Sequence, residues 1–207
     1  MMTTENPQIA LFWQWFANHE PDLKMLSTSD DSFWDVILDQ LKKVDGRLWF
    51  EMSSHETAPR EFVVTAEGKI EAFPVVSALV DAAPAIEGWE FVALKPPMGF
   101  DFTTTYEGVR FDPGQMWFLP LDSKSRINYL GLRVGIEGLR QEDESMAHTA
   151  VLVILDTGLG ERSAALDIQY TEVTELPPDP PLAGYIELTE LADYISWRKS
   201  KRATLQN

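Results

Sequence analysis

The tripeptide Asp156-Thr157-Gly158 is the part of the sequence that comes closest to a catalytic motif. It follows the apolar run 150–155, and aspartic proteases present a catalytic carboxylate in this way. Their chemistry needs two such carboxylates that share one proton, because like charges about 3 Å apart cannot both ionise. The chain has one Asp-Thr-Gly, so a protease site would require a homodimer. The competing interpretation, a strand that ends in a turn, is the one we favour.

Residues for metal, nucleophilic and phosphate chemistry are sparse. The histidines His19, His55 and His148 have no second histidine at a ligand spacing, and the chain has no cysteine. It contains no Gly-x-Ser-x-Gly motif, and its glycines 131–138 lack the Lys and Ser/Thr of a phosphate-binding loop. We therefore expect no catalytic, metal or cofactor-binding residues, and the sequence disfavours an enzyme.

Five carboxylates nevertheless keep a second function open, a carboxylate-dependent hydrolase or a small-molecule-binding protein. That hypothesis predicts that at least two of them meet in one pocket. The candidates are Glu51, Asp101, Asp112, Asp156 and Glu161.

Tryptophans outside the expected core indicate a binding surface instead. Trp13 and Trp15 cannot share one helix face, because residues two apart point about 200° apart around a helix. Trp49 and Glu51 lie two residues apart in an alternating segment, so they share one face of a strand. A covering helix is the commoner arrangement for such a face, and the alternative is a binding surface. The candidate surface combines Trp15, Trp49 and Glu51.

Hydrophobic spacing predicts about four helices and seven or eight strands. We expect helices near 6–20, 30–46, 74–83 and 189–197. We expect strands near 47–52, 60–66, 89–94, 106–111, 115–121, 127–136, 150–155 and 166–173. The first two strands can form a hairpin with residues 53–59 as its loop. The segment 150–155 is ambiguous, because its apolar β-branched residues favour a strand while its neighbours allow a helix. The strands come in runs, which predicts an α+β fold with a mostly antiparallel sheet. The expected organisation is a single domain 1–207, helical over about 6–45 and β-rich thereafter.

Several aromatic and glycine-containing segments resemble a bacterial family of domains of unknown function. The segments are Phe12-Trp13-Gln14-Trp15-Phe16, Leu48-Trp49-Phe50-Glu51, Glu61 to Gly68, Gly88-Trp89-Glu90-Phe91, Lys95-Pro96-Pro97 and Leu159-Gly160-Glu161. The resemblance spans most of residues 9–161. It implies an ordered intracellular domain and no particular activity.

Charge narrows the classes of partner. The chain has 207 residues with 33 acidic and 17 basic side chains, a net charge of −16, which disfavours nucleic acid and anionic membranes. Residues 1–6 lack the pattern of a signal peptide, and the longest apolar run is too short to span a membrane, so we expect a cytoplasmic protein. We predict a regulatory, immunity-like protein that binds a basic protein partner. The alternatives are the carboxylate-dependent enzyme above and a structural domain that forms homodimers.

Overall fold

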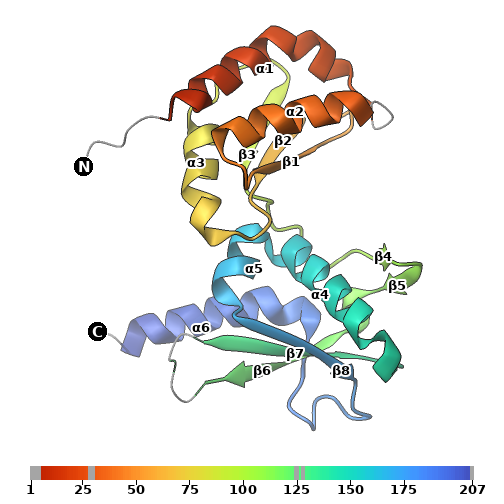
Figure 1. The fold of residues 1–207 in the computed structure, drawn as a ribbon. Helices are drawn as coiled ribbons and strands as arrows, with labels where there is room; N and C mark the ends of the chain where they lie inside the picture. The colour runs from red at the N-terminus through yellow and green to blue at the C-terminus, as the bar shows by residue number, and fades with distance from the viewer. Residues whose placement is uncertain (1–5, 28–30, 124–125, 127–128, 206–207) are drawn as a thin grey trace. The chain divides into compact units, whose positions relative to one another are not determined.

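The computed structural model describes residues 6–27, 31–123, 126 and 129–205 (Figure 1). The chain divides into two compact units, residues 1–95 and 96–207, and each is described by itself. The described residues form six α-helices and three sheets of three, two and four strands. The α+β class is confirmed, whereas the single sheet of seven or eight strands with four helices is not. The organisation as one domain stays a prediction.

Unit 1 consists of three helices and a sheet of order β1-β2-β3. β1 and β2 form the antiparallel hairpin expected from segments 47–52 and 60–66, and α3 connects β2 to the parallel strand β3. The predicted start of the second helix near Asp30 lies outside the described residues. The elements are α1 (Pro7–Met25), α2 (Asp31–Val44), β1 (Trp49–Met52), β2 (Arg60–Thr65), α3 (Phe73–Asp81) and β3 (Trp89–Ala93).

The first helix is longer than predicted. Asn6 caps it, because its side-chain oxygen accepts a hydrogen bond from the backbone N–H of Gln8 in the first turn at 3.0 Å. The predicted end at Glu20-Pro21 is wrong, since α1 continues to Met25 with Pro21 inside it. Proline removes one backbone hydrogen bond from a helix, which costs stability. Here the complete burial of Leu23 in the extended part of the helix offsets that cost.

An aromatic layer fills the space between the helices and one face of this sheet. Ring pairs across the layer are Trp13–Phe91 (4.6 Å), Phe16–Phe62 (5.2 Å) and Trp34–Phe50 (5.4 Å). Figure 1 shows α1 and α2 lying across the sheet. The third helix joins them on that side, because the Trp13 indole donates a hydrogen bond to the carbonyl of Leu79 on α3. On the opposite face, Val63 and Thr65 are buried, whereas Glu61 and Glu90 are exposed.

Unit 2 contains a two-stranded hairpin and a sheet of order β8-β7-β6-β9. β6 and β7 are antiparallel, and α4 and α5 connect β7 to the parallel strand β8. Residues 127–128 of the predicted strand 127–136 lie outside the described residues. The elements are β4 (Thr104–Tyr106), β5 (Val109–Phe111), β6 (Trp117–Asp122), β7 (Leu130–Ile136), α4 (Glu144–Leu159), α5 (Glu161–Asp167), β8 (Tyr170–Glu175), β9 (Ile186–Glu187) and α6 (Leu191–Leu205).

The predicted strand 106–111 is a hairpin. Glu107 and Gly108 both have positive φ, 48° and 81°, which is the geometry of the tight turns that join antiparallel strands. Tyr106 therefore pairs with Val109, and the two halves of the segment become β4 and β5.

Segment 150–155, for which we favoured a strand, lies in the helix α4. Its buried residues recur at helical spacing: Ala147, Ala150, Val151, Ile154 and Leu155. Leu152 and Val153 are each 45% exposed, so the outer side of the helix also carries apolar residues and the helical spacing is not visible in the sequence. Asp156-Thr157-Gly158 is consequently the last turn of this helix, not a turn after a strand. The predicted strand 166–173 is also wrong at its start, because α5 runs to Asp167 and β8 begins at Tyr170.

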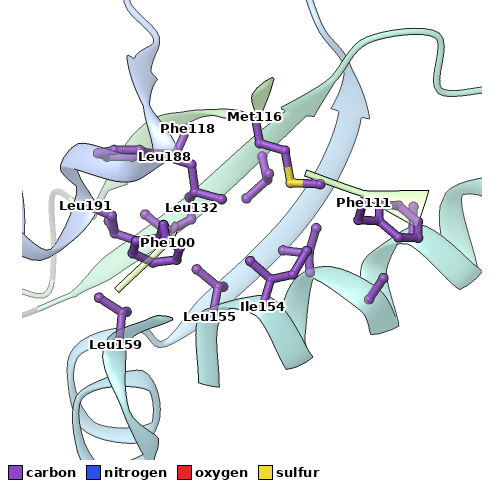
Figure 2. Packing of buried hydrophobic residues seen from close by; sticks show 14 of the residues in the cluster. Phe100, Phe111, Met116, Phe118, Leu132, Ile154, Leu155, Leu159, Leu188 and Leu191 are labelled. Atoms are coloured by element: carbon purple, nitrogen blue, oxygen red, sulfur yellow. The ribbon is translucent and has the colours of Figure 1, made fainter. Parts of the chain in front are cut away.

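The core of unit 2 lies between one face of the four-stranded sheet and the helices α4 and α6. Figure 2 shows it running along α4 from Leu159 at one end to Phe111 at the other. Phe100 packs so closely on α4 that a Cβ added to Gly158 would lie 2.2 Å from its ring. A small residue in the last turn of α4 is therefore a packing requirement.

Candidate functional site

The two faces of the unit 1 sheet have opposite character. Phe50, Phe62 and Phe91 point toward the helices, because their rings contact one another or rings of α1 and α2. Alternation along the strands turns the intervening residues to the other side. We call this side the acidic face, defined by its exposed residues Trp49, Glu51, Glu61 and Glu90.

Two lysines of the chain already place ammonium groups on the acidic face. The Lys42 Nζ atom lies 4.5 Å from the centre of the Trp49 ring, within the range of a cation–π interaction. The Lys95 Nζ atom lies 3.4 Å from a carboxylate oxygen of Glu51. Trp49 remains 37% exposed and the side chain of Glu51 59% exposed. This surface therefore accommodates cations at both of these residues.

Glu61 and Glu90 are the part of the acidic face that the sequence analysis missed. They lie directly opposite each other on the parallel strands β2 and β3. Neither carboxylate forms an ion pair with a described residue. Like charges placed opposite each other on neighbouring strands are destabilising. The structure thus holds a pair of glutamates without an ion-pair partner among the described residues, in the same sheet as Trp49 and Glu51.

Trp15, the third residue of the predicted surface, lies elsewhere. It is half-buried on α1, where its ring stacks on His19 at 4.9 Å and contacts Phe12 at 6.2 Å. Phe12 packs on Phe62, so α1 lies on the helical side of the sheet. The geometry unites Trp49 with Glu51 and leaves Trp15 on the other side.

Two of the five candidate carboxylates meet in one place. Asp101 and Asp112 both line a pocket of about 520 Å³ in unit 2. The Asp112 carboxylate accepts hydrogen bonds from the Gly114 N–H at 3.0 Å and from the Gln115 amide at 3.3 Å, so it is held by its own turn. Of the others, Glu51 belongs to the acidic face, Asp156 to α4, and Glu161 is fully buried at the start of α5.

The described residues offer no cluster for a metal ion. Among them, no three His, Asp or Glu side chains lie close enough together to hold one. His19 Nδ1 lies 2.8 Å from the carbonyl oxygen of Trp15, and His148 Nε2 lies 3.0 Å from that of Thr171, so both rings have structural contacts. None of the helices in the described part of the chain has the length and apolar character needed to cross a membrane.

Comparisons with protein-family models, with curated proteins and with solved structures found no match to this chain. The resemblance to a bacterial domain family stays a prediction. The function is therefore argued from the side chains and their arrangement.

Proposed function

We propose that the protein is a non-enzymatic binding protein of the cytoplasm whose acidic face holds a basic segment of a partner protein. The observation that carries the proposal is the opposed pair Glu61 and Glu90, which has no cation among the described residues. Opposed like charges destabilise a sheet, and a partner's cation between them would remove that repulsion. Binding would thus turn an unfavourable contact into a favourable one.

The rest of the face supports the same partner chemistry. Lys42 over Trp49 and Lys95 beside Glu51 show that ammonium groups fit two neighbouring positions. A partner's Lys or Arg side chains would extend this arrangement toward Glu61 and Glu90.

The charge of unit 1 supports the approach of such a partner. Unit 1 has 16 acidic and 7 basic residues, a net charge of −9. Complementary fields of this kind accelerate the encounter of two proteins and make it sensitive to salt.

The test is calorimetric titration with a lysine-rich and an arginine-rich peptide at low and at physiological salt. The double variant Glu61→Gln/Glu90→Gln should weaken binding about tenfold or more, which corresponds to about 1.4 kcal/mol. A matched double variant in unit 2, Glu107→Gln/Glu190→Gln, removes the same charge and should change the affinity less than about twofold. Equal losses in both variants would mean that the peptides respond to net charge alone, and the proposal would be wrong.

One observation favours the second candidate function, carboxylate-dependent hydrolysis or small-molecule binding. Asp101 and Asp112 line the same pocket together with Thr103 and Thr189. If that pocket binds or hydrolyses a small molecule, Asp101→Asn should abolish this binding or hydrolysis, while Glu61→Gln should leave it intact. A homodimer, the third alternative, is tested by light scattering of the whole chain across a concentration series.

A further inference from the structure

A second pocket of unit 2 has an apolar floor and a charged rim. It has a volume of about 590 Å³ and lies between β5 with the turn after it and the segment that joins β7 to α4. Phe111 and Met116 are buried in its floor, where Figure 2 shows both, and Met146 of α4 completes the floor. The volume lies within the range of about 300–1,000 Å³ that is typical of small-molecule sites.

Three of the five charged side chains that line this pocket, Asp112, Arg140 and Asp143, have hydrogen-bond or ion-pair partners within the chain. Asp112 accepts the two hydrogen bonds of its own turn. Arg140 donates to Asp143 at 2.8 Å and forms an ion pair with Glu142 at 3.1 Å. These groups therefore have partners before any ligand arrives.

Arg110 and Glu137 are different. Both are exposed and both line the pocket, yet neither side chain has a hydrogen bond or ion pair with a described residue, and they do not pair with each other. An arginine without a partner is notable in a chain that has 33 acidic and 17 basic side chains. Among the described residues of the lining, the pocket thus presents a cation and an anion that have no partner, above an apolar floor, together with the Asp112 carboxylate that only amide N–H groups hold.

We propose that this pocket binds a small zwitterion with an apolar body, an apolar α-amino acid or a short apolar peptide. Arg110 would pair with the carboxylate of the ligand, since the planar guanidinium matches a carboxylate with two parallel hydrogen bonds. Glu137 would pair with the ammonium group. Met116 and Met146 would contact the apolar side chain, because methionine adapts its shape to irregular partners. The site is separate from the acidic face, so either proposal can fail without the other.

The test uses four probes on the full chain: leucine, the dipeptide Leu-Leu, 4-methylpentanoate, which lacks the ammonium group, and isopentylamine, which lacks the carboxylate. Calorimetry and thermal shift at up to about 10 mM would detect a site with a Kd near 1 mM. We expect leucine or Leu-Leu to bind more tightly than the two analogues. The better of the two zwitterions tells whether the pocket is suited to an amino acid or to a peptide.

Single variants assign the two charges. Arg110→Gln should weaken zwitterion binding about tenfold and abolish the response to 4-methylpentanoate, while Glu137→Gln should weaken the zwitterion equally and abolish the response to isopentylamine. Glu107→Gln, on the same hairpin but outside the pocket, is the control and should bind as the wild type does. The proposal is overturned if neither zwitterion binds, if both variants bind normally, or if 4-methylpentanoate binds as tightly as leucine.

Discussion

The two units share one arrangement of three strands and differ in the charges on the outer face of these strands. In unit 1, β1-β2-α3-β3 is an antiparallel hairpin followed by a helix and a parallel strand. In unit 2, β6, β7 and β8 have the same order and directions, with the two helices α4 and α5 between β7 and β8. In each unit, a charged residue of the middle strand lies opposite a charged residue of the parallel strand, on the face away from the core. These pairs are Glu61 with Glu90 in unit 1 and Arg133 with Glu172 in unit 2.

A single position on the middle strand determines whether the charges on each sheet face have partners within the chain. Arg133 Nε lies 2.5 Å from a Glu172 oxygen, and the Tyr170 hydroxyl donates to the other oxygen of Glu172 at 2.7 Å. The face of unit 2 is therefore satisfied within the chain at this position. The corresponding pair in unit 1 consists of two glutamates, neither of which forms an ion pair with a described residue.

The largest expected effect concerns a buried arginine that fixes α1 to the sheet of unit 1. Arg60 is 3% exposed, and its guanidinium donates to the carbonyls of Leu23, Lys24 and Leu26 at the end of α1 and to that of Ser53. Arg60→Leu would leave these carbonyls without donors, at about 1–3 kcal/mol for each group that stays buried. We expect the free energy of unfolding to fall by about 3 kcal/mol or more, measured in urea.

Arg60→Lys is the control for this variant, because it keeps the charge and part of the hydrogen bonding and should lose less. Amide hydrogen exchange should show the loss of protection in residues 6–95. A loss of less than about 1 kcal/mol for Arg60→Leu would mean that the aromatic layer alone holds α1 in place.

A smaller effect is expected in unit 2, whose core depends on a small residue instead. Alanine in place of glycine normally stabilises a helix by about 1 kcal/mol. At Gly158 the added methyl group would lie 2.2 Å from the ring of Phe100, so we expect Gly158→Ala to destabilise the protein by about 2 kcal/mol. The double variant with Phe100→Leu should recover part of this loss, and a stabilising Gly158→Ala would show that the ring moves aside freely.

Sequence patterns predicted the local features of both units better than their pairings. Alternation placed Trp49 and Glu51 on one strand face and found the hairpin of β1 and β2, since both features depend on neighbouring residues. It did not predict that Glu61 and Glu90 are opposed, because β2 and β3 are separated in sequence by α3 and their register depends on residues far apart in the chain. It also misread the segment of α4 around Leu152 and Val153, where exposed apolar residues hide the helical period.

Exchanging the charges between the units tests the comparison itself. Arg133→Glu removes an ion pair and creates opposed like charges with Glu172, so we expect a loss of about 1 kcal/mol. Glu61→Arg creates an opposite-charge pair with Glu90 and should gain about 0.5 kcal/mol while it abolishes binding of basic peptides. Glu61→Gln removes the repulsion of Glu90 without adding an attraction, so the difference between Glu61→Gln and Glu61→Arg measures the new ion pair alone. Changes of the same sign in Arg133→Glu and Glu61→Arg would show that the two positions are not equivalent.

The smallest effect is a dependence on pH that unit 2 owes to its ion pair. Hydrogen bonds from the Tyr170 hydroxyl and from Arg133 hold the pKa of Glu172 below its ordinary value of 4.5. A carboxyl group whose pKa is lower in the folded state stabilises the protein above its unfolded pKa, and this contribution is lost as the pH falls through the folded pKa.

The wild type should therefore be more stable than Glu172→Gln at pH 7, by less than about 1 kcal/mol because the side chain is 31% exposed. Urea unfolding should show the difference shrinking below pH 4.5, and Tyr170→Phe should reduce it, since the tyrosine is the larger cause of the shift. A difference in unfolding free energy between the wild type and Glu172→Gln that stays constant with pH would mean that Glu172 acts through packing. The ion pair with Arg133 would then not be what stabilises the outer face of the unit 2 sheet.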